Sequence, residues 1–223
     1  MKNLKLIISL SLLVFLFTSC TEVREEFYPN GRLKSRIEYR FNKEHGKAIY
    51  YDEALRLSIE MMMKKGKKHG SFYKYHFNGK IETEAYYVDD IQEGVEASYD
   101  IKGNKLRETH YVNGLKDGPY YSWHDRDMPF ERGAFKQGLF DGEWKYYDER
   151  GMELGEASFT AGTGTMKGYD PNGHLILITN YANNLKNGVE IHFASNGDTL
   201  KITTYADDRI TSINHDAVEK NEE

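Results

Sequence analysis

The chain has 223 residues, a formal net charge of -5 and a single cysteine. One cysteine excludes an intrachain disulfide framework, and an acidic chain without a basic run argues against a nucleic-acid partner. The apolar content depends on rings, with 17 Tyr, 11 Phe and 2 Trp, which is typical of shallow sheets that are wet on one face rather than of a deep aliphatic core.

Residues 1–19 have the pattern of an export signal. Two lysines precede an apolar run at residues 6–17, which is too short to span a bilayer as a mature helix. The run ends in Phe-Thr-Ser-Cys, which resembles the lipobox of bacterial lipoproteins, although Leu is usual where Phe17 stands. The resemblance implies a signal peptide that is cleaved before Cys20, and lipidation of Cys20. We therefore expect a lipid-anchored chain at the bacterial envelope, on the outer membrane, with the side of the membrane left open. The alternative is an ordinary secretory signal in which Cys20 is incidental.

Removing residues 1–19 takes away two lysines and no acidic residue, so 28 basic and 35 acidic side chains remain and the formal charge becomes -7. This charge argues against a strongly electrostatic contact with anionic headgroups, which leaves the anchor as the expected membrane contact. Residues 20–26 are expected to be the lipidated cysteine and a short acidic spacer. A repeat array is expected over 27–213, followed by an acidic, disordered tail at 214–223.

The array is organised by a 24-residue frame whose markers are glycines. The markers are 24 residues apart except for one step of 22: Gly46, Gly70, Gly94, Gly118, Gly142, Gly164 and Gly188. A large ring follows each marker by five residues: Tyr51, Tyr75, Tyr99, Trp123, Tyr147, Tyr169 and Phe193. A second ring follows later in most units: Tyr87, Tyr111, Phe159, Tyr181 and Tyr205. A fixed period of this length predicts a repeat architecture.

Each unit has the pattern of a β-hairpin. In the third unit, residues 71–77 and 80–88 are rich in Tyr and β-branched residues and are separated by Asn-Gly, a strong hairpin signal. Residues 55–65 have helical propensity but fall in phase with the frame, so they too are predicted to be strand. Pro129 cannot donate to a ladder and predicts an edge, a bulge or a longer loop in the fifth unit. The sequence therefore predicts an all-β protein, an elongated twisted antiparallel sheet of about eight tandem hairpins.

Small residues indicate how the units pack. The position two before the second ring is small in most units: Ala85, Thr109, Gly133, Ala157, Thr179 and Thr203. A small residue beside a ring leaves room for a ring of the next hairpin, which predicts a ladder of rings on one face. Phe72, Tyr120 and Trp144 lie two after their markers, on the face opposite the rings at marker plus five. We expect these three to form an exposed strip that binds a partner. A second packed face, or residues chosen only for β propensity, is the alternative.

No residue pattern predicts catalysis or a metal site. The Gly-rich run at 162–168 resembles a phosphate-cradling loop but lacks a buried strand before it and a helix after it. The eight histidines have no metal-ligand spacing, and no serine lies in a nucleophile motif. We expect no enzyme activity, no catalytic residue, no cofactor and no metal.

The frame resembles the variant MORN repeat of bacterial proteins over about residues 27–205. The segments that carry the resemblance are 28–31 with Tyr39, 111–118 with Tyr120, and 135–142 with Trp144. The resemblance implies a sheet of successive hairpins and a role as an interaction scaffold, and one branch of the family is labelled as the antitoxin or immunity side of toxin pairs. Our leading hypothesis is a membrane-anchored, non-enzymatic scaffold that binds an unidentified protein or a surface polymer. The alternatives are an immunity protein and an envelope hydrolase in the fifth unit or in residues 162–168.

Overall fold

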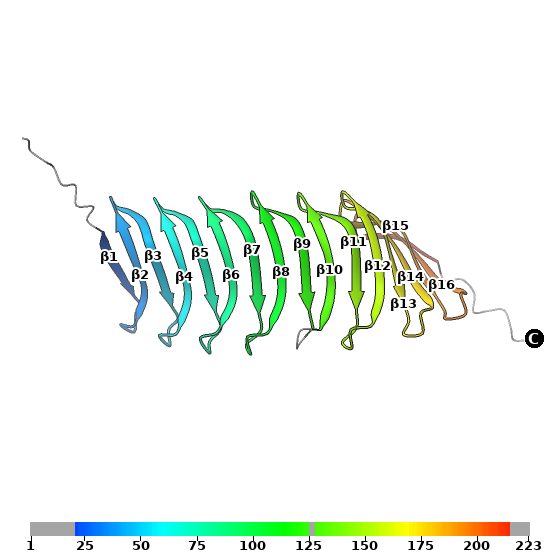
Figure 1. The fold of residues 1–223 in the computed structure, drawn as a ribbon, viewed down its shortest axis with the longest axis horizontal. Helices are drawn as coiled ribbons and strands as arrows, with labels where there is room; N and C mark the ends of the chain where they lie inside the picture. Colours follow the sequence, from blue (N-terminus) through cyan, green and yellow to red (C-terminus); the bar gives the residue numbers. More distant parts are fainter. Residues whose placement is uncertain (1–20, 125–127, 215–223) are drawn as a thin grey trace, which may run out of the picture.

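The computed structural model of the chain describes residues 21–124 and 128–214, and these residues form a single antiparallel sheet (Figure 1). Every strand pairs with the next strand in sequence. The strands are β1 Glu22–Phe27, β2 Leu33–Arg40, β3 Lys43–Tyr51, β4 Leu57–Lys64, β5 Lys67–Tyr75, β6 Ile81–Val88, β7 Ile91–Tyr99, β8 Lys105–Val112, β9 Leu115–Trp123, β10 Pro129–Lys136, β11 Leu139–Tyr147, β12 Glu153–Thr160, β13 Thr163–Tyr169, β14 Leu175–Ala182, β15 Leu185–Phe193, β16 Thr199–Ala206 and β17 Arg209–Asn214. The predicted fold class is confirmed, and it includes the methionine-rich strand β4.

The described residues include only part of the predicted terminal segments. Cys20, the signal at 1–19 and residues 215–223 of the predicted tail lie outside the described residues. The expected spacer is wrong as structure, because residues 22–26 belong to strand β1 and pair with β2. An acidic composition did not prevent pairing, since an edge strand can keep its side chains in water. In the described part of the chain, no segment forms a helix with the length and apolarity needed to cross a membrane.

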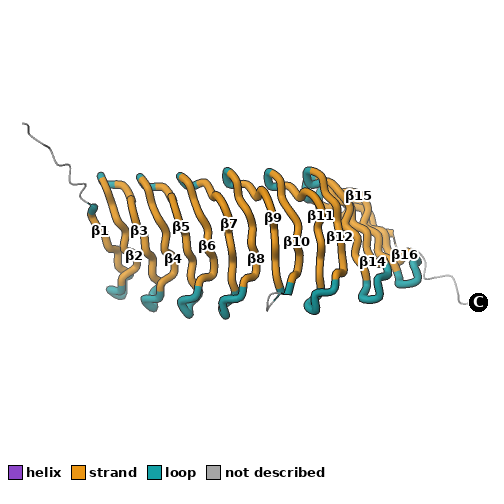
Figure 2. Tube along the Cα trace, in the orientation of Figure 1, coloured by secondary structure: helices purple, strands orange, loops and turns teal. Residues whose placement is uncertain are grey.

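The loops lie at the two ends of the strands (Figure 2). At one edge, two-residue turns join even to odd strands, and both residues are left-handed, as at Asp89 and Asp90 with φ of 51° and 74°. This is the geometry of type I′ turns, which match the twist of a hairpin. Backbone hydrogen bonds link each turn to the preceding hairpin, such as Gly138 N to Lys116 O at 2.7 Å and Asn184 N to Gly162 O at 2.9 Å. Five-residue loops close the other edge, and Pro129 begins β10 directly after one of them, at a register shift.

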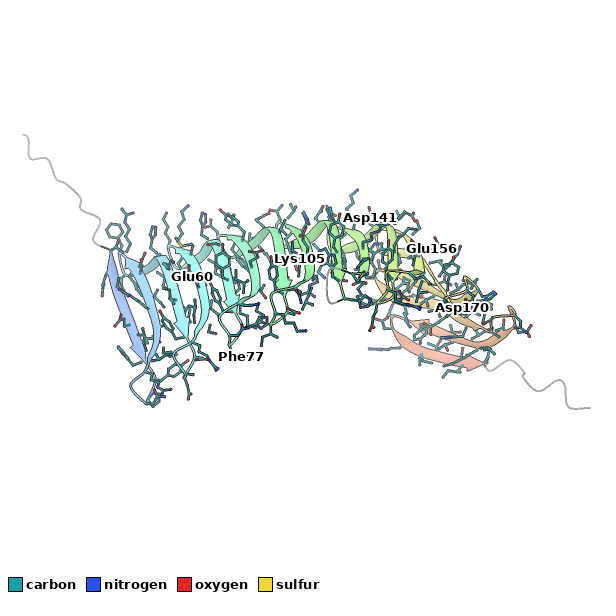
Figure 3. All side chains as sticks on the ribbon, turned by 60° about the horizontal axis from the view of Figure 1, so that its bottom comes forward. Glu60, Phe77, Lys105, Asp141, Glu156 and Asp170 are labelled. Atoms are coloured by element: carbon teal, nitrogen blue, oxygen red, sulfur yellow. The ribbon has the colours of Figure 1, made fainter. Side chains whose placement is uncertain are left out.

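The marker glycines lie in β-bulges. Gly118 has φ of 115°, and the pairing of β8 with β9 shifts around it, so that Thr109 pairs with Tyr120 and Tyr111 pairs with Lys116. The odd strand thus carries two extra residues at the bulge, in a conformation that favours glycine. Gly164 is the exception, because it has no positive φ and β12 pairs with β13 without a shift. The two-residue deletion in the frame is therefore the loss of one bulge. Strands β13–β17 turn away from the row of β1–β12 (Figures 1 and 3).

The register between strands determines which face carries the second rings. Each second ring, or the residue in its place, pairs directly with a marker glycine on the preceding strand, as Tyr87 does with Gly70 and Phe159 with Gly142. Residues that lie directly opposite each other on an antiparallel pair share a face, so the second rings of successive hairpins line one side of the sheet. We call the face that carries these pairs the packed face. It also carries Trp144, which pairs with the small residue Ala157.

The packed face contains the predicted ladder of rings. Tyr120 and Phe135 meet edge to face at 5.4 Å between ring centroids, Phe135 and Trp144 at 5.2 Å, and Phe159 and Tyr181 at 5.6 Å. Such pairs each contribute about 0.5–1.5 kcal/mol beyond burial. Trp144 is 2% exposed although no second layer covers the sheet (Figure 3). The core of this single-layer protein therefore lies within one face.

Gly133 shows how closely the ladder fits. A Cβ atom at Gly133 would lie 2.1 Å from Cδ2 of Trp144. The backbone of Gly133 has no positive φ, so space rather than conformation requires glycine here. The expectation that small residues make room for rings of the next hairpin is confirmed at this position.

We predict that Gly133→Ala destabilises the protein by about 1–3 kcal/mol, because the added methyl displaces Trp144. Gly168→Ala is the matched control, since its Cβ would meet only the side chain of Leu177 at 3.2 Å. Denaturant unfolding followed by circular dichroism measures both free energies. Equal stability of the two variants would contradict the packing described for Trp144.

A buried carboxylate replaces the ring in the last full unit. Glu190 is 7% exposed and accepts hydrogen bonds from Lys186, from the Thr179 hydroxyl at 3.2 Å and from His192 Nε2 at 3.2 Å. The Tyr205 hydroxyl donates to Glu190 Oε1, the oxygen that His192 also contacts, at 3.4 Å. Burial acts to raise the pKa of Glu190, but the hydrogen bonds from Lys186 and His192 outweigh it, so the pKa lies below its ordinary value of 4.5. These partners fit a structural role in the packed face.

We predict that Glu190→Gln lowers the free energy of unfolding by about 1–3 kcal/mol at neutral pH. Because the pKa of Glu190 is depressed in the folded state, the ionised carboxylate stabilises the fold above its unfolded pKa near 4.5, and this contribution is lost as pH falls through the folded pKa. The difference between the two proteins should therefore shrink in acid. Glu143→Gln, at an exposed position of β11, is the control. A difference that stays constant down to about pH 3 would contradict the ion pairing.

Candidate functional site

The described residues offer no metal centre. Across 21–124 and 128–214, no group of three or more His, Cys, Asp or Glu side chains is placed to hold a metal ion. The run at 162–168 forms part of a turn and strand β13, and strand β14 follows it rather than a helix. Asp125, Arg126 and Asp127 of the irregular fifth unit lie outside the described residues.

The predicted exposed strip of Phe72, Tyr120 and Trp144 is wrong as an accessible surface. All three lie opposite the rings at marker plus five, as expected, but that side is the packed face. Tyr120 and Trp144 are 8% and 2% exposed, and their rings are 5.5 Å apart within one hydrophobic cluster. Phe72 packs edge to face on Tyr87 at 5.8 Å. The strip and the ladder were expected on opposite faces, and they share one because each second ring pairs across from a marker glycine.

The other side of the sheet, which we call the accessible face, carries the rings at marker plus five. These rings are half-buried, and each lies at the end of an odd strand: Tyr51, Tyr75, Tyr99, Trp123, Tyr147, Tyr169 and Phe193. Tyr121 is exposed two residues before Trp123 and stacks on it at 6.0 Å, with 26° between the ring planes. Tyr73 and Tyr75 form a similar tilted pair at 6.5 Å. This face therefore presents a row of rings along the length of the sheet.

Carboxylates lie beside several of these rings. The Tyr99 hydroxyl donates to Glu84 Oε1 at 2.5 Å, and the Tyr169 hydroxyl donates to Glu156 Oε1 at 2.8 Å. Burial and the Glu84 carboxylate raise the pKa of Tyr99 to about 12, so its hydroxyl stays protonated and remains a donor to Glu84 at neutral pH. Glu60 and Glu108 occupy the equivalent frame positions, 24 residues before and after Glu84.

Basic side chains pair with some of these carboxylates and replace others. Lys47 Nζ lies 2.8 Å from Glu60, and Lys105 Nζ lies 2.8 Å from Glu108. The position of the carboxylates is taken by Arg36 one unit before Glu60 and by Arg132 one unit after Glu108. The Arg132 guanidinium lies over the Tyr147 ring at 5.5 Å and covers part of it. The continuous run of ring and carboxylate therefore extends over three units, from β4 to β9.

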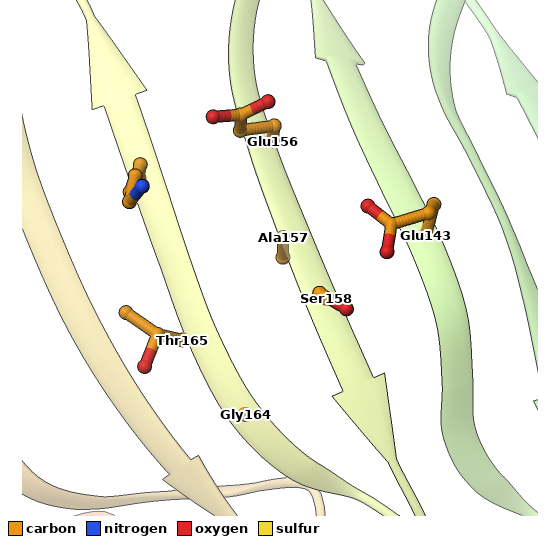
Figure 4. Close-up of a pocket in the computed structure, with 7 residues that line it drawn as sticks. Glu143, Glu156, Ala157, Ser158, Gly164 and Thr165 are labelled. Carbon is orange, nitrogen blue, oxygen red and sulfur yellow. The ribbon is translucent and has the colours of Figure 1, made fainter.

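A groove lies on the sheet where the bulge is missing (Figure 4). It has a volume of about 440 Å³ and is lined by polar residues of β11, β12 and β13. Glu143 pairs with Ser158, and Glu156 pairs with Lys167, so two carboxylates, a hydroxyl and an amine share this surface. The groove continues the row of carboxylates past Arg132.

Side chains of the five-residue loops hold the backbone of some of these ring residues by hydrogen bonds. His76 Nε2 donates to the Tyr99 carbonyl at 2.9 Å, and His124 Nε2 donates to the Tyr147 carbonyl at 3.1 Å. Tyr28 makes the same bond to Tyr51 through its hydroxyl at 2.8 Å. Asp52, Asp100 and Asp148 occupy the loops between them, where each carboxylate accepts from the backbone of its own loop.

Neither the alternation of the loops nor the row of carboxylates beside the rings was predicted from the sequence. The loop residues Tyr28, His76 and His124 are 48 residues apart, so two hairpins form the larger repeating unit. This spacing is visible in the sequence. The carboxylates at 60, 84 and 108 keep the 24-residue period, but they could not be separated from other polar positions without knowing that they lie beside the rings.

A comparison with protein families adds to this geometry. The model described as MORN repeat variant matches residues 23–40, 68–89 and 163–183. The three segments fall on β1–β2, β5–β6 and β13–β14, each a pair of neighbouring antiparallel strands. No curated protein matches the chain. The matches and the tandem hairpins together support the identification of the chain as a MORN-repeat protein.

Proposed function

We propose that this protein is a membrane-anchored, non-enzymatic repeat scaffold of the bacterial envelope, which binds a partner through its accessible face. The matches to the MORN repeat variant support a repeat scaffold for binding. The observation that carries the proposal is the difference between the two faces of the sheet. One face buries its rings in the ladder, whereas the other presents a row of half-buried rings at every hairpin. Accessible rings rimmed by polar groups are typical of interaction surfaces.

Anchoring through Cys20 completes the proposal. The support for it is the apolar run with the lipobox-like residues, which places the cysteine where lipidation requires it. Strand β1 begins at Glu22, so the sheet would start two residues from the anchor. The acyl chains contribute about 0.8 kcal/mol for each buried methylene, so a cysteine with several chains would hold the protein on the membrane.

We predict that Cys20→Ala abolishes incorporation of labelled palmitate and releases the protein from the membrane fraction. Phe17→Leu is the matched control, because it restores the residue that is usual in a lipobox and should keep the label. Palmitate in the Cys20→Ala protein, or an unlabelled control, would contradict anchoring at Cys20.

The same cells test the binding face. Chemical crosslinking in intact cells, followed by mass spectrometry, should capture a discrete partner with the unchanged protein and lose it with Tyr121→Ala plus Trp123→Ala. Tyr86→Ala is the control, since Tyr86 is 47% exposed on the same face but lies away from the row. Changes at Tyr120 or Trp144 do not serve here, because these rings are buried and their loss would lower stability as well as any binding. The immunity role implied by the family resemblance would use the same face and would be recognised by a toxin domain as the captured partner.

A further inference from the structure

We infer that the accessible face binds a neutral, extended β-1,4-linked glycan, with one disaccharide for each hairpin. The inference rests on the proposed binding role of this face and adds the chemical class of the ligand. Three observations carry it, namely the spacing of the rings, the acceptors beside them, and the arginines that bound the run.

The spacing of the rings follows from the sheet. Neighbouring strands lie about 4.7–4.9 Å apart, so rings on every second strand recur at about 9.5 Å. An extended β-1,4-linked glycan repeats over a disaccharide of about the same length, because successive sugars are turned over and every second sugar presents the same side. Each ring can therefore meet the apolar side of one sugar in every disaccharide.

Beside the rings of the run lie three carboxylates, Glu60, Glu84 and Glu108, and two lysines that pair with Glu60 and Glu108, so acceptors are in excess. The Tyr99 and Tyr169 hydroxyls already donate to Glu84 and Glu156, and an ionised carboxylate can only accept. The remaining lone pairs of the carboxylates need donors, and sugar hydroxyls provide donors all along the chain. Lys47 and Lys105 pair with Glu60 and Glu108 but leave the run with an excess of negative charge, which disfavours uronate or phosphate groups and favours a neutral polymer.

A proline-rich peptide is the closest competitor in dimensions. A polyproline II helix advances about 9.3 Å for each turn of three residues, which is similar to the hairpin spacing. Proline has no backbone N–H, however, so such a peptide offers few donors to the carboxylates. The acceptors on this face therefore favour the glycan.

The arginines set the length of the site. Glu60, Glu84 and Glu108 pair with the residues two before Tyr75, Tyr99 and Trp123. Arg36 and Arg132 take the equivalent frame positions on either side. Arg132 provides a cation where these three units provide a carboxylate, and its guanidinium lies over the Tyr147 ring. Three units correspond to three disaccharides, so the continuous site accommodates six sugars.

Isothermal titration calorimetry with the detergent-solubilised full-length protein tests this assignment. The probes are cello-oligosaccharides and chito-oligosaccharides of two to eight sugars, a proline-rich decapeptide and polygalacturonate. We expect the affinity for the neutral oligosaccharides to rise up to six sugars and then to level off, with no binding of polygalacturonate. Trp123→Ala should lower the affinity for the hexasaccharide about tenfold, the effect of losing one central ring, whereas Tyr86→Ala should leave it unchanged.

The outcomes separate this inference from the proposed function. Failure of every neutral oligosaccharide to bind, or equal binding by the Trp123→Ala protein, overturns the glycan assignment. Binding of the decapeptide alone also overturns it and assigns the face to a peptide. If the crosslinked partner of intact cells is still lost with Tyr121→Ala plus Trp123→Ala, the binding face stands without the glycan. If neither glycan binding nor crosslinking responds to the ring variants, both the inference and the proposed function fail.

Discussion

The packing of rings on one another and over small residues within one face supports the rest of this structure. A single-layer sheet has no second layer against which to bury its side chains, so its apolar contacts must form within one face. Rings that pack on one another and over a small residue of the neighbouring strand, as Trp144 packs on Phe135 and over Gly133, are shielded from water without a second layer. Trp144 reaches 2% exposure in this way, above Gly133 and beside Ala157. Because each ring contacts only neighbouring hairpins, stability accumulates along the array as in other repeat proteins.

This one-sided core leaves the other face free to bind. Its rings are held at the ends of the odd strands, and alternating loops fix their backbone through bonds such as that from His76 to the Tyr99 carbonyl. The bulges at the marker glycines keep the hairpins alike, and where the bulge is missing, at Gly164, Asn184 bridges to Gly138 and Phe140 two turns away. The row of rings and the fold are thus products of the same period, since one residue of each hairpin packs on the packed face and another lies on the accessible face, which we propose as the binding surface.

The period made most of the fold predictable. The marker glycines and Asn-Gly turns located the hairpins, and the frame correctly assigned the Met-rich stretch of β4 to strand against its helical propensity. The small residues before the second ring correctly indicated a ring ladder. The face assignment of Phe72, Tyr120 and Trp144 could not be obtained in the same way, because alternation gives the side of a residue only within one strand. Relating one strand to the next requires the register, and the bulge adds two residues to every odd strand where the marker glycine has a positive φ. The row of Glu60, Glu84 and Glu108 was hidden for the same reason, since its meaning depends on the rings beside it.

The two tryptophans of the chain offer the most direct test of the one-sided core, because Trp144 lies on the packed face and Trp123 on the accessible face. Acrylamide quenching can be compared between Trp123→Phe, which retains only Trp144, and Trp144→Phe, which retains only Trp123, after circular dichroism has shown that both proteins are folded. A one-sided core predicts blue-shifted emission and weak quenching for Trp144, and quenching several-fold stronger for Trp123. Equal quenching of the two, or stronger quenching of Trp144, would contradict the assignment of the faces and with it the proposed binding surface.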